Sequence, residues 1–443
     1  MLDIKLIREK PDFVKANLER RNNKEILDLF DVVVSKDSRQ RELIQKSESL
    51  RKKRNDLTRE ADELRKANKD FSPIVKEVRE INSELPSYEQ ELEGIKAGIK
   101  NDLMSLPNIM HESVPIGKDD PENVVVKTHG KIKKPSFEIK HHGQIAAELG
   151  IADFERAVKI SGSGFYFLKG DLALLDFALQ NFAIGLLVKK GYTLVEPPFM
   201  MGRKPYEGVT DLHDFENVMY KIEGEDLYLI ATSEHPMGAM YMDETIEENN
   251  LPIKFAGISA CFRKEIGKHG LDERGLFRVH QFNKIEQFIF CMPEDSWKFH
   301  EALRKNAEEL LEALEIPYNV TNICTGDLGT VAAKKYDLNG WSPREQKYIE
   351  LMSCSNCTSY QSARLGIRYR KKDGSKDYLH TLNSTMVATT RALRIILENY
   401  QTAEGTVKIP KVLQPYMYGK KEILPNTKKE FIQKQKKEAG KKK

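Results

Sequence analysis

Cysteine is scarce in this sequence, and neither charge sign is in clear excess. The five cysteines among 443 residues show no paired framework, which fits a reducing cytoplasm better than secretion. The 71 basic and 67 acidic residues nearly cancel to a formal charge of +4. A uniformly basic coat for nucleic acid is therefore excluded.

Long apolar runs are also missing. The start, MLDIK, is charged and has no apolar signal core, and no run approaches the roughly 18 residues of a membrane span. We therefore expect a soluble, cytoplasmic protein with room for two or three domains. The one low-complexity stretch is the tail, where residues 420–443 hold ten lysines and three glutamates. We expect residues 419–443 to form a basic, disordered tail.

Two periodic apolar stripes predict a helical hairpin within residues 1–110. One stripe runs from Leu43 to Leu64 in steps of three and four, and a second runs from Val75 to Ile99 after a polar break. Stripes of this kind are typical of an antiparallel coiled-coil arm. We expect its first helix over about residues 37–68, and Pro86 should kink or interrupt the second helix.

The rest of the chain predicts a mixed fold. Residues 111–135 carry several prolines with little periodicity and are typical of a linker. Residues 136–418 then mix helical and strand patterns. We expect helices over 172–188 and 295–314, strands over 227–231, 255–262, 279–290 and 348–353, and a hairpin of 367–370 with 378–382. Consecutive hairpin-joined strands predict an α+β fold, with a mostly antiparallel sheet flanked by helices.

Two segments of this region place charges in apolar, strand-forming surroundings. They are residues 261–265 (CFRKE) and 277–286 (FRVHQFNKIE), with a glycine-punctuated stretch between them that predicts a hairpin loop over 267–275. Buried charges persist when they pair with each other or with a charged ligand. A structural ion-pair cluster is the alternative to a binding site. Alternation would let Arg263, Glu265, Phe282 and Glu286 share one pocket, suited to a zwitterionic, polyphosphate-bearing substrate.

These segments resemble motif 2 of the class II aminoacyl-tRNA synthetases, and specifically of the seryl-tRNA synthetases. Residues 191–198 (GYTLVEPP) resemble motif 1, residues 231–234 (ATSE) resemble the serine-binding loop, and residues 383–401 resemble motif 3. The resemblance extends from the LDIK start to about Tyr418. It implies a class II catalytic sheet over residues 136–418, preceded by a tRNA-binding helical arm over 1–110.

The resemblance also implies a reaction. Serine and ATP would give seryl-adenylate and pyrophosphate, and serine would then pass to the 3′ end of tRNA(Ser), with the selenocysteine tRNA as a second candidate partner. Motif 1 implies a homodimer. Two alternatives stay open: an amino acid:carrier-protein ligase on the same catalytic fold, and a catalytically inactive RNA-binding paralogue.

Serine activation brings two anions together, so the site needs fixed positive charge around the phosphates. Arginine suits this role because its planar fork matches phosphate oxygens and stays charged. By the resemblance, Arg263 contacts the α-phosphate, Arg391 contacts the far phosphates and the adenine, and both are catalytic. Phe282 would stack on the adenine. The remaining residues of the implied ATP site are Lys264, Glu265, Val279, Glu350, Leu351, Met352 and Ser353.

A magnesium ion is implied as well, held by Glu350 and Ser353, since hard cations prefer oxygen ligands. Alternation puts these two side chains on opposite faces of an ideal strand, so joint coordination needs a twist or a bulge. Without the resemblance, Glu350 could be any sheet carboxylate. The nearby Cys354 and Cys357 form a lone C-x-x-C pair, for which small residues in a packed strand end are favoured over a zinc site.

Serine recognition needs a partner for the ammonium and one for the hydroxyl. The implied residues are Thr232, Ser233, Glu234, Arg263, Glu286 and Thr385. Thr385 departs from the commoner glycine-rich motif 3 by adding a methyl group. Gly164 is a second departure, because the family often has arginine there.

The arm carries a basic cluster, Arg51, Lys52, Lys53 and Arg54. The resemblance implies that it grips the tRNA through phosphate contacts, which would give salt-sensitive binding with little base readout. A solvated helix face is the alternative for these four residues.

Overall fold

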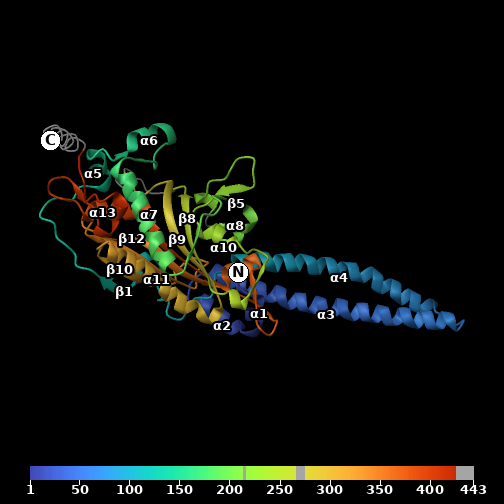
Figure 1. The fold of residues 1–443 in the computed structure, drawn as a ribbon. Coiled ribbons are helices and arrows are strands. Elements are labelled where there is room, and N and C mark those ends of the chain that lie inside the picture. Colours follow the sequence, from blue (N-terminus) through green and yellow to red (C-terminus); the bar gives the residue numbers. More distant parts are fainter. Residues whose placement is uncertain (213–215, 266–274, 426–443) are drawn as a thin grey trace, which may run out of the picture. The chain divides into compact units, whose positions relative to one another are not determined.

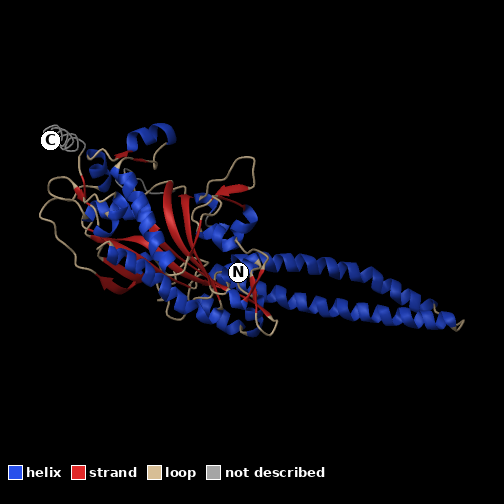
Figure 2. Cartoon of the chain, in the orientation of Figure 1, coloured by secondary structure: helices blue, strands red, loops and turns tan. Residues whose placement is uncertain are grey.

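The computed structural model describes residues 1–212, 216–265 and 275–425, in two compact units that divide after Ile109. Figure 1 traces the chain from the N-terminal helices into the sheet, and Figure 2 shows how strands and helices alternate within it. Most of the predicted loop 267–275 and the tail from residue 426 lie outside the described residues.

The first unit is the predicted helical hairpin. Short helices α1 (Ile4–Glu9) and α2 (Pro11–Glu19) precede α3 (Lys24–Lys66) and α4 (Ser72–Ser105). At 1.5 Å per residue, the 43 residues of α3 extend about 65 Å. The helix starts earlier than predicted because the side chain of Asn23 caps it, accepting hydrogen bonds from the backbone N–H of Glu25 and Ile26.

Pro86 does not interrupt α4, which runs on through it and bows along its length (Figure 1). The hairpin seam is closed by Leu43 and Ser47 from α3 and by Ile81 and Leu85 from α4, all of them buried. The predicted stripes are therefore the packing faces of the two helices.

The second unit is built on an eight-stranded sheet with the order β1-β10-β11-β12-β15-β9-β8-β4. Neighbours from β1 to β8 are antiparallel, and β4 joins β8 in parallel. The bounds in that order are Val124–His129, Tyr318–Asn322, Lys334–Ser342, Lys347–Thr358, His380–Ala388, Gln281–Cys291, Ile253–Phe262 and Thr193–Val195. The antiparallel α+β fold is confirmed, although the patterns of β10 and β11 were not recognised as strands.

Helices α7 (Asp171–Lys189), α11 (Ser296–Ala313) and α13 (Thr389–Asn399) cover one face of this sheet. Their apolar residues meet Ile285 and Ile289 of β9 in the largest core cluster. Among the described residues, α7 is long and apolar enough to cross a membrane by length and composition alone, and half of its most apolar window is buried. Packing against the sheet accounts for that apolar composition.

A second core lies on the opposite face of β9. Phe288 and Phe290 pack there with residues of α8 (Arg203–Val209), α10 (Glu234–Ala239) and α12 (Tyr360–Leu365). The two faces of one strand thus serve two cores, as the period of two requires. Smaller elements complete the unit: α5 (His142–Glu148), α6 (Phe154–Ser161), β2 (Ala152–Asp153), β3 (Phe167–Leu168), β5 (Met200–Gly202), β6 (Leu227–Leu229) and β7 (Thr245–Glu247).

A hairpin is present near residue 370, but β13 (Arg368–Arg370) pairs with β14 (Lys376–Tyr378), and residues 380–382 of the predicted strand 378–382 belong instead to β15 of the main sheet. Two other segments are more ordered than expected. The predicted linker 111–135 contributes β1 to the sheet, and its Val114 is buried. The start of the predicted tail is folded too, since β17 (Glu422–Ile423) pairs with β16 (Val407–Lys408).

Candidate active site

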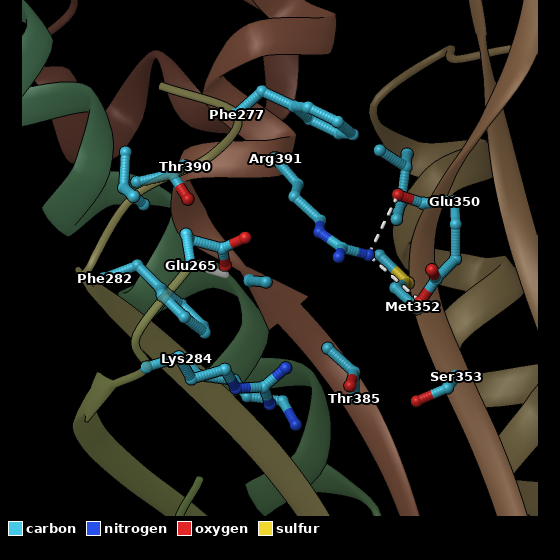
Figure 3. Close-up of a pocket in the computed structure, with 14 residues that line it drawn as sticks. Glu265, Phe277, Phe282, Lys284, Glu350, Met352, Ser353, Thr385, Thr390 and Arg391 are labelled. Atoms are coloured by element: carbon cyan, nitrogen blue, oxygen red, sulfur yellow. Dashed lines mark hydrogen bonds and ion pairs between the residues drawn. The ribbon is translucent and has the colours of Figure 1, made fainter. Parts of the chain in front are cut away.

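One open cavity collects most of the predicted ATP-site residues (Figure 3). It is lined by the predicted Arg263, Glu265, Val279, Phe282, Glu350, Leu351, Met352, Ser353, Thr385 and Arg391. Residues that the sequence did not single out also line it: Phe277, Lys284, Ala388 and Thr390. The lining residues come from β9, β12, β15 and α13 and from the two ends of the β8–β9 connection, so the sheet, this connection and one helix N-terminus assemble the site.

Alternate side chains of β9 form one polar side of this cavity. Phe282, Lys284 and Glu286 follow each other in steps of two on one face. Asn283 points to the other face, where its amide donates to Asp176 of α7 at 3.0 Å. Phe282 and Lys284 line the cavity directly. Glu286 lies next to it, fully buried and paired with Lys284.

A bulge in β12 brings Glu350 and Ser353 to the same face. In the pairing with β11, Met352 lies opposite Leu338 and Glu350 lies opposite Asn339, so Leu351 is an extra residue. An extra residue advances the alternation by one position. The bulge that joint use of Glu350 and Ser353 requires is therefore present in this strand.

The neighbouring strand β15 has the same irregularity. Thr385 lies opposite Glu286 and Val387 lies opposite Ile285, which leaves Met386 as the extra residue. Thr385 and Ala388, three positions apart, consequently both line the cavity. Thr385 thus lies opposite Glu286, close enough for its side chain to oppose the rise in the pKa of the Glu286 carboxyl.

Arginines and carboxylates face each other across the cavity. Nη1 of Arg391 lies 3.0 Å from Oε1 of Glu350 and also donates to the Glu350 carbonyl oxygen at 3.2 Å (Figure 3). The guanidinium of Arg263 lies 5.5 Å from the centre of the Phe282 ring, and its Nε donates to the carbonyl oxygen of Ala231. The guanidinium of Arg391 lies 5.8 Å from the ring of Phe277.

Behind this cavity lie two carboxylates, the half-buried Glu234 and the fully buried Glu286. The amide of Asn383 donates to Glu234 Oε1 at 3.0 Å, and Lys284 Nζ donates to Thr232 Oγ1 at 3.1 Å. Burial and the charge of Glu286 raise the pKa of Glu234, and burial likewise raises the pKa of Glu286 against the opposing effect of Lys284. The charges of Lys284 and Arg263 oppose both shifts and favour the ionised carboxylates, which are the partners that an ammonium group needs.

Two predicted residues point elsewhere. The ammonium of Lys264 lies over the ring of Tyr220, 5.6 Å from its centre, and Lys264 does not line the cavity. The hydroxyl of Ser233 is buried and donates to the carbonyl oxygen of Gly257 at 3.3 Å. In this structure the side chains of Lys264 and Ser233 therefore make structural contacts outside the cavity.

Asp337 lies beside a cavity residue, and sequence reasoning missed it. It is the pairing partner of Ser353 across β11 and β12, and its buried Oδ1 has no hydrogen-bond partner among the described residues. Burial and the charge of Glu350 raise its pKa. No local pattern marks Asp337, because its proximity depends on the β11–β12 register. Lys284 was predictable from the sequence, since it lies two residues from both Phe282 and Glu286 and so faces the same side of the strand.

The donors around Glu350 fit a hard cation. A carboxylate, the hydroxyl of Ser353 and the Oδ1 oxygen of Asp337 are all oxygen ligands. Within residues 1–212, 216–265 and 275–425, no group of three or more His, Cys, Asp or Glu has the geometry of a metal centre. A magnesium ion that takes its other ligands from phosphate and water does not need one. Cys354 and Cys357 are buried, and burial raises the pKa of both thiols.

The arm's basic cluster is divided by ion pairs. Arg51 bonds Glu89 at 2.6 Å and Lys53 bonds Glu77 at 2.5 Å, both across the hairpin. Lys52 is exposed and Arg54 is half-buried, and no ion pair of either is found among the described residues of the arm. The cluster therefore offers two cations that are not already neutralised within the hairpin.

Gly164, one of the two departures from the family pattern, sits against His280. Its φ is +80°, and a Cβ there would lie 2.4 Å from the imidazole of His280. The carbonyl oxygen of Gly164 accepts from the backbone N–H of His280 at 2.9 Å. Close approach of the two segments thus favours glycine at this position.

Comparisons with known proteins agree with this geometry. Residues 217–400 match the family model of the tRNA synthetase class II core domain (G, H, P, S and T), and residues 1–110 match that of the seryl-tRNA synthetase N-terminal domain. The fold and the site thus define a class II aminoacyl-tRNA synthetase.

Similar sequences and structures narrow the class. The chain is 59% identical over 421 residues to the serine–tRNA ligase of Methanocella arvoryzae and 56% identical over 422 residues to that of Methanospirillum hungatei, covering 95% of this chain and 99% of each relative. Seryl-tRNA synthetase from Pyrococcus horikoshii, solved with ATP, superposes with a TM-score of 0.93 at 46% identity, covering 96% of this chain and all of that one. The Naegleria fowleri cytoplasmic enzyme, solved with AMP, gives 0.89 at 36% identity, covering 96% and 99%. The chain belongs to the seryl-tRNA synthetase family.

Proposed function

We propose that this chain activates serine with ATP, releasing pyrophosphate, and then transfers serine from the adenylate to the 3′ end of tRNA(Ser). One observation carries the proposal: a cavity lined by Arg263, Arg391 and Glu350 adjoins two carboxylates, the half-buried Glu234 and the buried Glu286. The first set suits a polyphosphate and the second suits an ammonium group. A substrate that bridges both ends has the chemistry of an aminoacyl-adenylate.

At the phosphate end, the two arginines provide fixed charge. The guanidinium of Arg263 lies near the Phe282 ring, and its charge acts on both Glu234 and Glu286, so we expect it to reach the α-phosphate and the serine carboxylate. Arg391, at the start of α13, would hold the far phosphates. Phe277 and Phe282 offer two aromatic faces in this cavity, of which Phe282 is proposed to stack on the adenine.

A magnesium ion at Glu350 and Ser353 would neutralise the phosphates and polarise them for attack. Asp337 would support it from the adjacent strand. Because Arg391 pairs with Glu350, the arginine and the metal ligand hold each other in position near the same phosphates.

At the serine end, Glu234 and Thr232 would receive the ammonium, and Glu286 with Thr385 would receive the hydroxyl. Thr232, Glu286 and Thr385 are buried from water, so a ligand without a hydroxyl would leave polar atoms unpaired. Sites of this kind discriminate by roughly 10⁴. We therefore expect strong rejection of alanine.

The hairpin of residues 1–110 is proposed as the tRNA handle. Lys52 and Arg54 are the members of the basic cluster best placed for phosphate contacts, since Arg51 and Lys53 are engaged within the arm. tRNA(Ser) is the expected partner and the selenocysteine tRNA a second one.

A homodimer through the motif 1 region and a cytoplasmic location complete the proposal. Apolar side chains are exposed there: Phe177 and Val188 on α7, Leu194 on β4 and Met200 on β5. Exposed apolar groups on neighbouring elements are typical of a protein interface.

Two rivals predict different outcomes in one experiment. A carrier-protein ligase would activate an amino acid without charging tRNA, and an inactive paralogue would do neither. Serine-dependent ATP–pyrophosphate exchange, measured together with tRNA charging, separates them. Exchange and charging with serine support the proposal, and absence of exchange in the folded protein would refute it.

A further inference from the structure

A buried histidine outside the sequence motifs joins two parts of the ATP end. His142 is the first residue of α5 and is fully buried. Its Nε2 accepts a hydrogen bond from the backbone N–H of Leu276 at 3.0 Å, and its Nδ1 lies 3.3 Å from Oε1 of Glu398. Because Nε2 accepts, the ring proton lies on Nδ1 and is donated to the carboxylate.

Glu398 belongs to α13, the helix that begins at Thr389 and carries Arg391. It is completely buried, and it also accepts hydrogen bonds from Ser342 and from Arg394, the latter at 3.2 Å. Because three hydrogen-bond partners hold the Glu398 carboxylate, its position is well defined. His142 therefore ties the backbone at Leu276 to a rigid position on this helix.

The residue after Leu276 completes the connection. The ring of Phe277 lies 4.2 Å from the guanidinium of Arg394 and 5.8 Å from that of Arg391, and it lines the cavity (Figure 3). The next residue, Arg278, lies 3.7 Å from the carboxylate of Glu265, another cavity residue. Leu276, Phe277 and Arg278 thus contact, in turn, His142, the arginines of α13 and Glu265 in the cavity wall.

Gly275 shows how close this approach is. A Cβ on Gly275 would lie 2.3 Å from Nε2 of His142 and 3.1 Å from the ring of His141. A side chain at position 275 would push the imidazole away from Leu276. Glycine at position 275 therefore leaves room for the hydrogen bond between Leu276 and His142.

We propose that His142 is a positioning residue for ATP: it links Leu276 to Glu398 and so fixes Phe277 against the helix that carries Arg391. This inference rests on the proposed function, because its main readout is serine-dependent pyrophosphate exchange. It predicts a selective effect, since the serine end is built from Glu234, Glu286 and Thr385, which do not contact this link.

The test compares His142→Ala with His142→Gln. The alanine variant should raise the KM for ATP by about 10-fold or more, as expected for loss of a buried hydrogen-bonded link, with the KM for serine almost unchanged. Glutamine has one acceptor and one donor at its tip, so it should recover much of the ATP affinity. The dissociation constant of ATP without serine, measured by calorimetry, should follow the same order.

Three further variants keep the inference testable if His142→Ala folds poorly. Gly275→Ala should reproduce the ATP defect with the histidine intact. Glu398→Gln should do so too, and combining it with His142→Ala should add little, because both break one link. His380→Ala is the matched control, since this half-buried histidine bonds Ser296 and does not line the cavity.

Equal effects on serine and ATP, no recovery with glutamine, or the same ATP defect in His380→Ala would overturn the positioning role. A wild-type protein without serine-dependent exchange would instead overturn the proposed function. The two failures are therefore distinct.

Discussion

Arg391 and Glu350 are ion-paired at 3.0 Å, although one begins a helix and the other lies in the middle of a strand. The pair joins the proposed holder of the far phosphates to the proposed metal ligand. Neither side chain is therefore placed by its own element alone. Removing one should disturb the other.

Arg391→Ala should nearly abolish adenylate formation while the fold persists. Loss of a preorganised charge at the phosphates should cost on the order of 3 kcal/mol in the transition state, or about 100-fold in rate. Pyrophosphate exchange measures the loss, and circular dichroism checks the fold. Near-normal exchange in a folded variant would refute the role of Arg391.

Metal dependence should follow Glu350. Exchange should require Mg²⁺, and Glu350→Gln should raise the Mg²⁺ concentration needed for half-maximal rate, because a charged oxygen ligand is lost. A zinc-selective chelator should leave the rate unchanged. If zinc restored activity lost to that chelator, Cys354 and Cys357 would have to be reconsidered as ligands.

The pH profile of kcat/KM for serine should show an acidic limb, which the KM for ATP should lack. Burial raises the pKa of Glu234 and Glu286 above the ordinary value of 4.5, and binding of an ammonium needs their ionised forms. The kcat/KM for serine should therefore rise as pH rises through the raised pKa of this pair. The KM for ATP should change little over the same range. Glu234→Gln should remove or shift the limb, and an unchanged profile in that variant would exclude Glu234 as its source.

The arm and the catalytic unit should be separable. Deleting residues 48–86 and joining Ser47 to Ser87 by a short flexible turn keeps Arg8–Asp37 and Ile99 at the base of the hairpin. Exchange should survive, because no cavity residue is removed, and tRNA charging should fall heavily. Loss of both activities in a folded protein would mean that the arm supports serine activation itself.

The division of the basic cluster gives a matched pair of variants. Replacing Lys52 and Arg54 by glutamine should weaken tRNA binding and lower the salt slope by roughly one unit for each phosphate that the arm no longer binds. Replacing Arg51 and Lys53 should change the slope less, because Glu89 and Glu77 already neutralise them. Fluorescence titration at several salt concentrations measures both. A reversed order would show that the ion pairs open to receive the RNA.

Local patterns predicted the parts of the fold that depend on local sequence. The stripes containing Leu43 and Ile81 gave the hairpin, and the apolar run over residues 172–188 gave α7. Pro86 was overestimated as a helix breaker, because a long helix can bend around a proline. The edge strand β1 was mistaken for a linker, since its exposed residues 124–126 lack the alternation of a half-buried strand.

Site residues that belong to a local motif were predictable from the sequence. Residues that only long-range contacts bring to the site were not. Arg263, Phe282, Glu350 and Arg391 line one cavity as expected. Asp337 escaped notice because a long-range pairing alone brings it beside Ser353. His142 escaped for the same reason, since it meets Leu276 across more than a hundred residues of chain.

The extra residues Leu351 and Met386 have a consequence for sequence comparison. Each shifts its strand by one step, so the side chains that share a wall of the cavity are three apart, as in Glu350 with Ser353 and Thr385 with Ala388. A search for remote relatives that scores strands by even spacing would reject them. Removing Met386 should turn Ala388 away from the cavity without removing a residue that lines it, whereas removing Leu351 should turn Ser353 away and also delete one lining residue. In these two strands, chain length between residues is itself under functional constraint.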